Sequence, residues 1–243
     1  MNDREFAAMN EVEESHFWFS HKRFLIGRII SRYFPENSNP VILDSGCGTG
    51  RDLKEYPNST GMDINLTGLF FAKEKNILLI NGNVNAIPVK NNIFDIILSM
   101  DVVQHKGVEE AESVRQYARV LKKNGILIIN LPAFGILYSM HDRSVDNAKR
   151  FSRMEIKRLL SNNFRVEEMF FWNGVFILPA SAVRILTSEL AHFTGKSEVA
   201  KVNKLLNRIN SFILRLESEL SLRSVLPMGF SLLTVARKIS DTK

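Results

Sequence analysis

An acidic residue followed by three alternating glycines is the stretch of this sequence with the clearest chemical meaning. Segment 41–50 reads VILDSGCGTG, so that Asp44 closes an apolar run and Gly46, Gly48 and Gly50 follow it. Glycine permits positive φ and leaves room for a ligand beside the backbone, so we expect this loop to contact a ligand. Glycines are also needed for packing wherever a strand turns into a helix, and that alternative stays open.

The spacing of these glycines excludes two common nucleotide-binding loops. A dinucleotide fingerprint, G-x-G-x-x-G, would need glycine in place of Arg51, and no Gly-Lys-Ser/Thr triplet of a phosphate-binding P-loop follows. The Asp44 carboxylate would repel a pyrophosphate and attract an ammonium group. The loop therefore favours a ligand that carries a cation.

Two later apolar runs also end in polar side chains. Asp63 closes the second run, where a carboxylate can accept hydrogen bonds from both hydroxyls of a ribose. After the third run, Asn83 offers an amide acceptor for an exocyclic amine, and Val84 offers an apolar cover for a purine. A cation, a ribose and an adenine together describe S-adenosylmethionine (SAM), whose product after methyl transfer is S-adenosylhomocysteine (SAH).

Short apolar runs alternate with amphipathic segments along the chain, which predicts an α/β fold with a mostly parallel sheet and helices on both faces. We predict strands over residues 41–44, 59–63, 77–81, 94–99, 125–131, 164–172 and 229–238. We predict helices over residues 66–74, 109–123 and 152–163, and a helical insert over 175–222 before the last strand.

Four segments resemble, in order, the motifs of the class I SAM-dependent methyltransferases: LDSGCGTG, GMDIN, GNVNAIPVKNNIFDIILSMDVVQH and LKKNGILIINLP. The resemblance covers about residues 40–132 and implies a Rossmann-like, seven-stranded methyltransferase fold. The residues that it assigns to the cofactor are Asp44, Gly46, Gly48, Gly50, Asp63, Ile64, Asn83, Val84 and Met100. The adenine-contacting position is often acidic in this family and is Asn83 here, whose amide oxygen still accepts a hydrogen bond.

We expect one methyltransferase domain over residues 1–243. Within it, residues 1–36 form a helical cover, 40–132 the SAM-binding core, and 133–243 the acceptor side with the insert and the last strand. The insert is expected to be an acceptor lid, a dimer contact or an element at a membrane surface.

The segment HFWFSHKRFLIGRIISRYF (16–34) predicts an amphipathic helix that starts with aromatic residues. Aromatic faces attract cations, and an arginine can pair with the methionine carboxylate of SAM. In the subgroup that the sequence most resembles, such a segment covers the cofactor, which assigns Phe17, Trp18 and Arg23 to closing over SAM. Plain core packing is the alternative for these side chains.

The segment 131–152 follows the fifth predicted strand, and it carries the residues expected to meet the methyl acceptor. If the acceptor is a hydroxyl, a base must take its proton. His141 is the first candidate, oriented by Asp142, and His105 is the second. Each histidine has a structural alternative, as a loop residue bonded to backbone or as a cap one helical turn from Asp101.

Three further residues of this segment, Tyr138, Arg143 and Arg150, are expected to bind the acceptor. A carboxylate acceptor would need no base, and Arg143 or Arg150 would then anchor it. The wider pattern resembles bacterial and archaeal methyltransferases associated with glycan, cell-envelope or secondary-metabolite synthesis. That resemblance favours O-methylation of a small-molecule, sugar or lipid-linked hydroxyl, with N-, C- or carboxyl O-methylation, or a SAM-binding pseudoenzyme or partner subunit, as alternatives.

Composition excludes several other classes of protein. The net charge is +6, but basic and acidic residues are interleaved, so we expect no nucleic-acid partner. A single cysteine excludes a disulfide framework and a multi-cysteine zinc site, and we expect no metal. No secretory signal or membrane-spanning stretch is recognisable, which favours the cytoplasm. Peripheral membrane contact stays open, as does the choice between monomer and homodimer.

Overall fold

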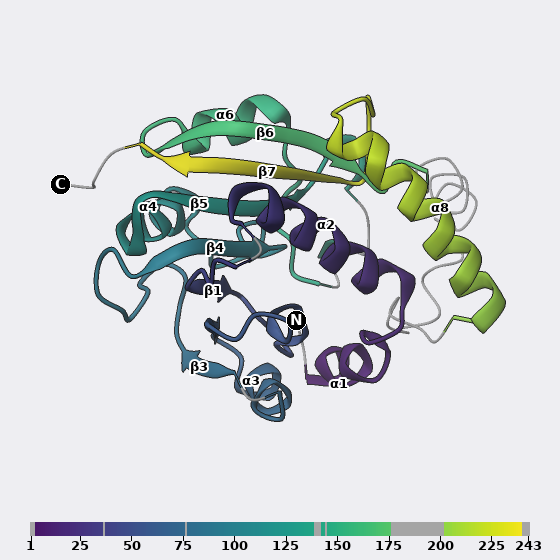
Figure 1. Ribbon diagram of the computed structural model, residues 1–243, viewed down its shortest axis with the longest axis horizontal. Coiled ribbons are helices and arrows are strands. Elements are labelled where there is room, and N and C mark those ends of the chain that lie inside the picture. The colour runs from purple at the N-terminus through teal and green to yellow at the C-terminus, as the bar shows by residue number, and fades with distance from the viewer. Residues whose placement is uncertain are drawn as a thin grey trace.

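The computed structural model describes residues 3–35, 37–75, 77–138, 142–143, 145–175 and 202–239, and it contains a seven-stranded sheet of order β3-β2-β1-β4-β5-β7-β6 (Figure 1). The strands are β1 (Ile42–Ser45), β2 (Ser59–Asp63), β3 (Leu78–Asn81), β4 (Phe94–Met100), β5 (Leu121–Pro132), β6 (Phe164–Trp172) and β7 (Ser231–Lys238). Strands β1 to β5 pair in parallel, and β7 lies antiparallel between β5 and β6. The predicted α/β class and mostly parallel sheet are confirmed.

Helices cover both faces of this sheet. They are α1 (Asp3–Val12), α2 (Phe17–Tyr33), α3 (Leu66–Lys73), α4 (Glu110–Val120), α6 (Arg153–Leu160) and α8 (Lys204–Leu222), with short 3-10 turns η1 (Arg51–Leu53) and η2 (Gly135–Leu137). Side chains of α4 and α6 join one core cluster, and side chains of α2, α3 and η1 join another. Alternate residues of the central strands enter opposite clusters, as Ile96 and Ile97 of β4 do, because side chains alternate across a strand.

Several helix limits have visible local causes. The His16 side chain accepts a hydrogen bond from the N–H of Trp18 and caps α2. A capping box joins Ser152 and Glu155 at the start of α6. The predicted helix 109–123 was too long, because α4 ends at Val120 and Leu121 is already extended, buried and paired with Phe94.

The predicted insert 175–222 is described only in part. Its second portion contains α8, which runs beside α2 and contacts β6 (Figure 1). Residues 176–201 lie outside the described residues. Among the helices that the structure describes, none is both long enough and apolar enough to cross a membrane.

Candidate functional site

The strand order reverses between β1 and β4, which places the ends of these two strands on either side of a topological switch point. Ligands of open α/β sheets bind in the crevice at the carboxyl ends of the strands at such a point. The glycine loop follows β1 on one side of this crevice. Met100, which is buried, ends β4 on the other side, and Asp101 follows it.

All three glycines of the loop have positive φ, at 92°, 52° and 73° for Gly46, Gly48 and Gly50. A Cβ atom on Gly46 would overlap the side chain of Val102, and one on Gly50 would lie 2.7 Å from Ile77 Cδ1. Packing therefore requires glycine at both of these positions. The packing role and the ligand role predicted from the sequence are thus compatible in the same loop.

Asp44 is the most unusual charged group of the crevice. The residue is 2% exposed, and among the described residues its Oδ1 has no hydrogen-bond partner. Burial raises the pKa of Asp44 to about 8, and the Asp52 carboxylate adds to the rise while the Lys22 ammonium opposes it. A buried carboxylate with an unpartnered oxygen fits a ligand that brings a cation.

Asp63 ties the glycine loop to the next strand end. Its Oδ2 accepts a hydrogen bond of 2.9 Å from the N–H of Gly48, and its Oδ1 accepts one of 2.9 Å from the N–H of Asn65. This structural role was not anticipated from the sequence. Each carboxylate oxygen has a second lone pair, so the predicted bond to a ribose stays compatible with the geometry. Ile64, the next residue, is exposed.

The predicted adenine contacts lie after β3. The Asn83 side-chain oxygen accepts a hydrogen bond of 2.9 Å from the N–H of Asn85, which closes a local turn. Asn83 is exposed and Val84 is buried. One lone pair of the amide oxygen therefore serves the turn, and the second is left for a donor such as an exocyclic amine.

Phe17 and Trp18, the aromatic residues of the predicted cover, contact other elements of the fold. The N–H of Phe17 donates to Asn207 Oδ1 of α8, and Phe17 lines a groove between α2 and α8. The Trp18 ring packs 5.4 Å from the Trp172 ring of β6. Phe17 is thus directed toward α8, because α8 packs along α2.

Helix α1 packs on the glycine loop at Gly48. A Cβ atom on Gly48 would lie 3.3 Å from Met9 Cε and 3.4 Å from Phe6 Cε1. The Arg23 guanidinium donates to the backbone oxygens of Glu13 and Glu14, just beyond α1, at 2.9 and 3.0 Å. Arg23 therefore holds the end of α1 in this structure.

Lys22, the residue before Arg23, was missed by the sequence reasoning. Its Nζ lies 2.6 Å from Asp52 Oδ2, and its side chain is 15% exposed. Burial lowers the pKa of Lys22, but attraction by the carboxylates of Asp52, Asp101 and Asp44 outweighs that effect, and the pKa is raised overall. The ammonium group of Lys22 thus belongs to the charged groups of the crevice. The only signal in the sequence was its place next to the predicted arginine.

Asp101 was also missed as a site residue. Its φ is 60°, and its Oδ1 accepts a hydrogen bond of 2.8 Å from the Asn130 amide of β5. The Asn130 oxygen in turn accepts from Trp172 Nε1 at 2.8 Å. Burial raises the pKa of Asp101. An acidic residue directly after a buried strand was the available signal, as it was for Asp44 and Asp63.

On the acceptor side, the structure places the second candidate base. His105 is half-buried, burial lowers its pKa, and among the described residues its Nδ1 has no hydrogen-bond partner. A lowered pKa keeps the imidazole neutral near pH 7, as a proton acceptor requires. His141, the first candidate, lies outside the described residues.

Asp142 and Arg150 pair with each other. Arg150 Nε lies 3.0 and 3.1 Å from the two carboxylate oxygens of Asp142, and Arg150 also donates to the backbone oxygen of Ala133. Both side chains are buried. Arg150, predicted as an anchor of the acceptor, is thus occupied by an internal ion pair, whereas the predicted pairing of Asp142 with His141 involves a residue outside the described ones. Their charges instead fasten the loop after β5.

The remaining predicted acceptor residues lie near this pair or on the surface. The Tyr138 hydroxyl donates to the backbone oxygen of Asn147 at 2.9 Å. Asn147 also donates to Asp142, so Tyr138 braces the same loop. Arg143 is exposed. Among the described residues, no group of three or more histidine, cysteine, aspartate or glutamate side chains could hold a metal ion.

Comparison with known proteins adds an independent line of observation. Residues 43–129 match the family model of a methyltransferase domain. An uncharacterised protein of Methanocaldococcus jannaschii is 38% identical over 92 residues, which are 37% of this chain and 36% of that protein. The ubiquinone/menaquinone biosynthesis C-methyltransferase of Campylobacter jejuni is 30% identical over 42% of this chain and 48% of its own length.

The chain thus spans less than half the length of these two relatives. A solved structure of a SAM-dependent methyltransferase from Archaeoglobus fulgidus is similar over 89% of this chain and 94% of that chain, with a TM-score of 0.55 and 20% identity. At that identity the likeness concerns the fold. The family match and this fold both include the switch point, where Asp44 lies in β1, Asp63 ends β2 and Asp101 follows β4.

Proposed function

We propose that this chain is a class I SAM-dependent methyltransferase and that it transfers the methyl group of SAM to a hydroxyl oxygen of a small-molecule, sugar or lipid-linked acceptor, which the match of residues 43–129 to a methyltransferase-domain model supports. The observation that carries the proposal is the buried Asp44 carboxylate, with its unpartnered oxygen, beside the glycine loop. When bound, SAM supplies an electrophilic methyl group on a sulfonium. Titration calorimetry with SAM and SAH tests the proposal, and binding of neither would overturn it.

Each residue of the crevice is assigned to one part of the cofactor. Asp44 receives the ammonium group of the amino-acid end, and the Lys22 ammonium, held at the same crevice, receives its carboxylate. Asp63 accepts from the ribose hydroxyls, and Asn83 accepts from the adenine amine while Val84 covers the ring. Holding donor and acceptor together is the main source of rate in such a transfer, worth about 7–11 kcal/mol in favourable systems.

We assign the contact with the SAM carboxylate to Lys22, whereas the sequence pattern assigned it to Arg23. Binding measurements alone can distinguish these two assignments. Lys22→Met is expected to weaken SAH binding about tenfold or more, because a hydrogen bond between charged groups contributes about 1.5–3 kcal/mol. Binding of 5′-methylthioadenosine, which lacks the amino-acid end, should not change. Calorimetry with both ligands measures the difference. Arg23→Met is the matched control, and an SAH-specific loss in that variant would return the role to Arg23.

A hydroxyl acceptor needs a proton acceptor, and we place the neutral imidazole of His105 in that role. It shares the β4 side of the crevice with Asp101, whose carboxylate raises the pKa of His105 and partly offsets the effect of burial. His141, predicted first from the sequence, remains the alternative. In either case the base contributes about 10²–10⁴ in rate.

Substitution separates the two histidines. His105→Gln is expected to lower turnover about a hundredfold or more while SAM affinity stays unchanged. Wild-type activity should fall on acidification only below the ordinary histidine pKa of about 6.5, because burial lowers the pKa of His105. The assay is methyl transfer from labelled SAM to a panel of hydroxylated acceptors, with His141→Gln in parallel. Full activity of His105→Gln would remove His105 as the base.

Methyl transfer to carbon is the second candidate, favoured by the similarity to the Campylobacter jejuni C-methyltransferase. The same base would then remove a proton from an activated carbon acid. For carboxyl O-methylation, Arg143 remains as the predicted anchor, because Arg150 is paired with Asp142. The position of the methyl group in the product, read by NMR, distinguishes oxygen from carbon.

A further inference from the structure

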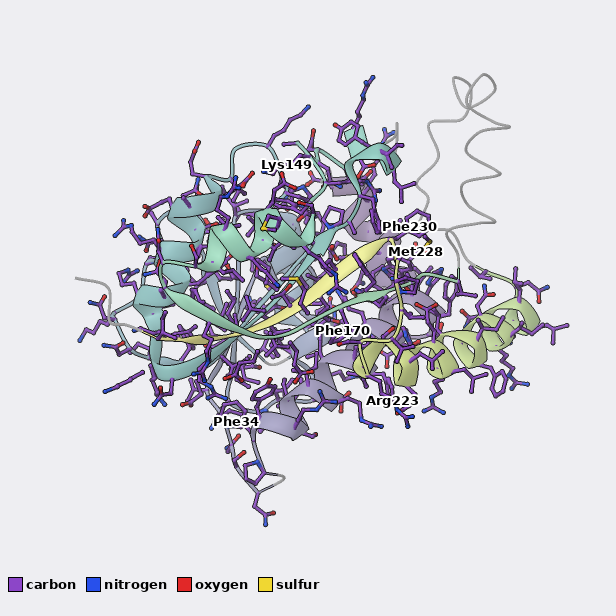
Figure 2. The ribbon with its side chains drawn as sticks, turned by 90° about the horizontal axis from the view of Figure 1, so that it is seen from above. Phe34, Lys149, Phe170, Arg223, Met228 and Phe230 are labelled. Atoms are coloured by element: carbon purple, nitrogen blue, oxygen red, sulfur yellow. The ribbon has the colours of Figure 1, made fainter. Side chains whose placement is uncertain are left out.

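Helix α8 has apolar side chains on two opposite faces. The inner face buries Leu214 and Leu222. The outer face carries a stripe whose members recur every three or four residues, the spacing of one helix face. The stripe consists of Leu205, Ile209, Phe212, Leu216 and Leu220, which are 68%, 46%, 64%, 58% and 45% exposed. Figure 2 shows α8 at the periphery of the molecule, with side chains that point away from the sheet.

A groove of about 390 Å³ lies beside this stripe, between α2 and α8. Its walls combine phenyl rings with two guanidinium groups. The lining residues are Phe17, Ser20, His21, Phe24, Arg208, Ser211, Phe212 and Arg215. Phe212 belongs to both the groove and the stripe, so the two features form one continuous surface.

The charge of this surface is positive. Among the residues that the structure describes, no carboxylate lies within salt-bridge distance of Arg208 or Arg215, and Arg215 lies 5.8 Å over the Phe24 ring. Burial and the charge of Arg215 together lower the pKa of His21 to about 4. Lys204 begins α8, and Arg223 follows its last residue, as Figure 2 shows for Arg223.

Both acidic residues of α8 already have partners within the protein, so they do not neutralise Arg208 or Arg215. Glu217 is buried and accepts hydrogen bonds from the N–H groups of Gly174 and Val175 at 2.8 and 3.0 Å. Glu219 pairs with Arg28 of α2 at 3.1 Å. Two guanidinium groups therefore remain for an external anion, next to an apolar stripe along a helix that is about 28 Å long.

We propose that α8 and the groove dock the protein on an anionic lipid surface. The apolar stripe enters the interfacial region of the bilayer, and Arg208 and Arg215 bind lipid phosphates. Charge complementarity is the basis for choosing this partner. An exposed apolar face, flanked by arginines that have no carboxylate partner among the described residues, matches acyl chains beneath phosphate groups. The proposal does not depend on methyl transfer, and its test measures binding to vesicles.

The experiment is co-sedimentation of the full chain with vesicles of phosphatidylcholine alone or mixed equally with phosphatidylglycerol. We expect binding to the anionic vesicles that weakens with added salt. Arg208→Gln/Arg215→Gln should reduce it about thirtyfold, since each basic residue near an anionic surface contributes about 1 kcal/mol. Phe212→Ser/Leu216→Ser should reduce binding while preserving its salt dependence. Lys157→Gln/Arg158→Gln, which removes two exposed cations from α6, should bind nearly as the wild type does.

Four results would overturn the proposal. The first is equal affinity for neutral and anionic vesicles, or no binding to either. The second is a loss in the α6 control as large as in the arginine variant, which would indicate unspecific attraction by net charge. The third is a wild-type dimer by light scattering that Phe212→Ser/Leu216→Ser converts to a monomer without any vesicle binding. Inorganic phosphate is included as a competitor, and displacement at low millimolar concentration would assign the groove to a free anion.

Discussion

Asp44→Asn is expected to weaken binding of SAM and SAH about a hundredfold, because hydrogen bonds to charged groups contribute about 1.5–3 kcal/mol. The substitution keeps the shape of the buried side chain and removes the charge that attracts the ammonium group. Affinity of the wild type should rise as the pH approaches about 8, where Asp44 ionises, and should fall again at higher pH, because the α-amino group of the ligand also loses its charge near about pH 8. Calorimetry between about pH 6 and about pH 9 measures both effects.

The same variant should be more stable than the wild type at alkaline pH. Burial raises the folded-state pKa of Asp44 to about 8, well above the unfolded value of about 3.9. Between these values the folded state holds a proton that the unfolded state has released, so Asp44 lowers stability as the pH rises through this window. Asparagine does not ionise, so the variant avoids this loss of stability. The Tm of Asp44→Asn should exceed that of the wild type most above about pH 8, and the difference should vanish near about pH 4.

Asp95→Asn is the matched control for this pair of effects. Asp95 lies in β4 away from the crevice, where it pairs with Lys122 at 2.9 Å and accepts a hydrogen bond from the N–H of Val41. SAM affinity of this variant should equal that of the wild type. Undiminished binding by Asp44→Asn, or an affinity that does not change with pH, would contradict the role given to Asp44.

Arg150→Met is expected to lower the free energy of unfolding by about 3–5 kcal/mol, because it leaves the buried Asp142 carboxylate without its cation. The loss of the Arg150 hydrogen bond to Ala133 also frees the loop after β5. Urea denaturation followed by circular dichroism measures the change as a lower midpoint. SAM binding should persist at temperatures where the variant is folded, because Arg150 lies on the acceptor side.

Two further variants separate this structural role from an acceptor-binding role. Asp142→Leu/Arg150→Met removes both charges and should recover much of the stability, since an apolar pair can replace a buried ion pair. Lys157→Met changes an exposed side chain of α6 and should alter stability by no more than about 0.5 kcal/mol. A stable Arg150→Met variant with a selective loss of turnover would restore Arg150 as the anchor of the acceptor.

The sequence by itself determined much of the fold and the cofactor half of the site. Short buried runs alternating with amphipathic segments predict a parallel sheet, because these periodicities follow from local backbone geometry. The carboxyl ends of parallel strands meet at one edge, so Asp44 and Asp63 could be placed together before any contact was known. The C-terminal limit of α4 could not be predicted from the sequence, because Leu121 becomes extended through pairing with Phe94 of β4.

Only the tertiary structure decided which side chains pair. Lys22 approaches Asp52, Arg150 approaches Asp142, and Phe17 faces α8, while sequence patterns had favoured Arg23, a free Arg150 and a cover over the cofactor. Burial and the choice of partner for a charge depend on how the whole chain packs, and no local pattern encodes them. The same reason separates the two faces of α8, because packing against α2 and β6 determines which apolar stripe is covered and which stays exposed.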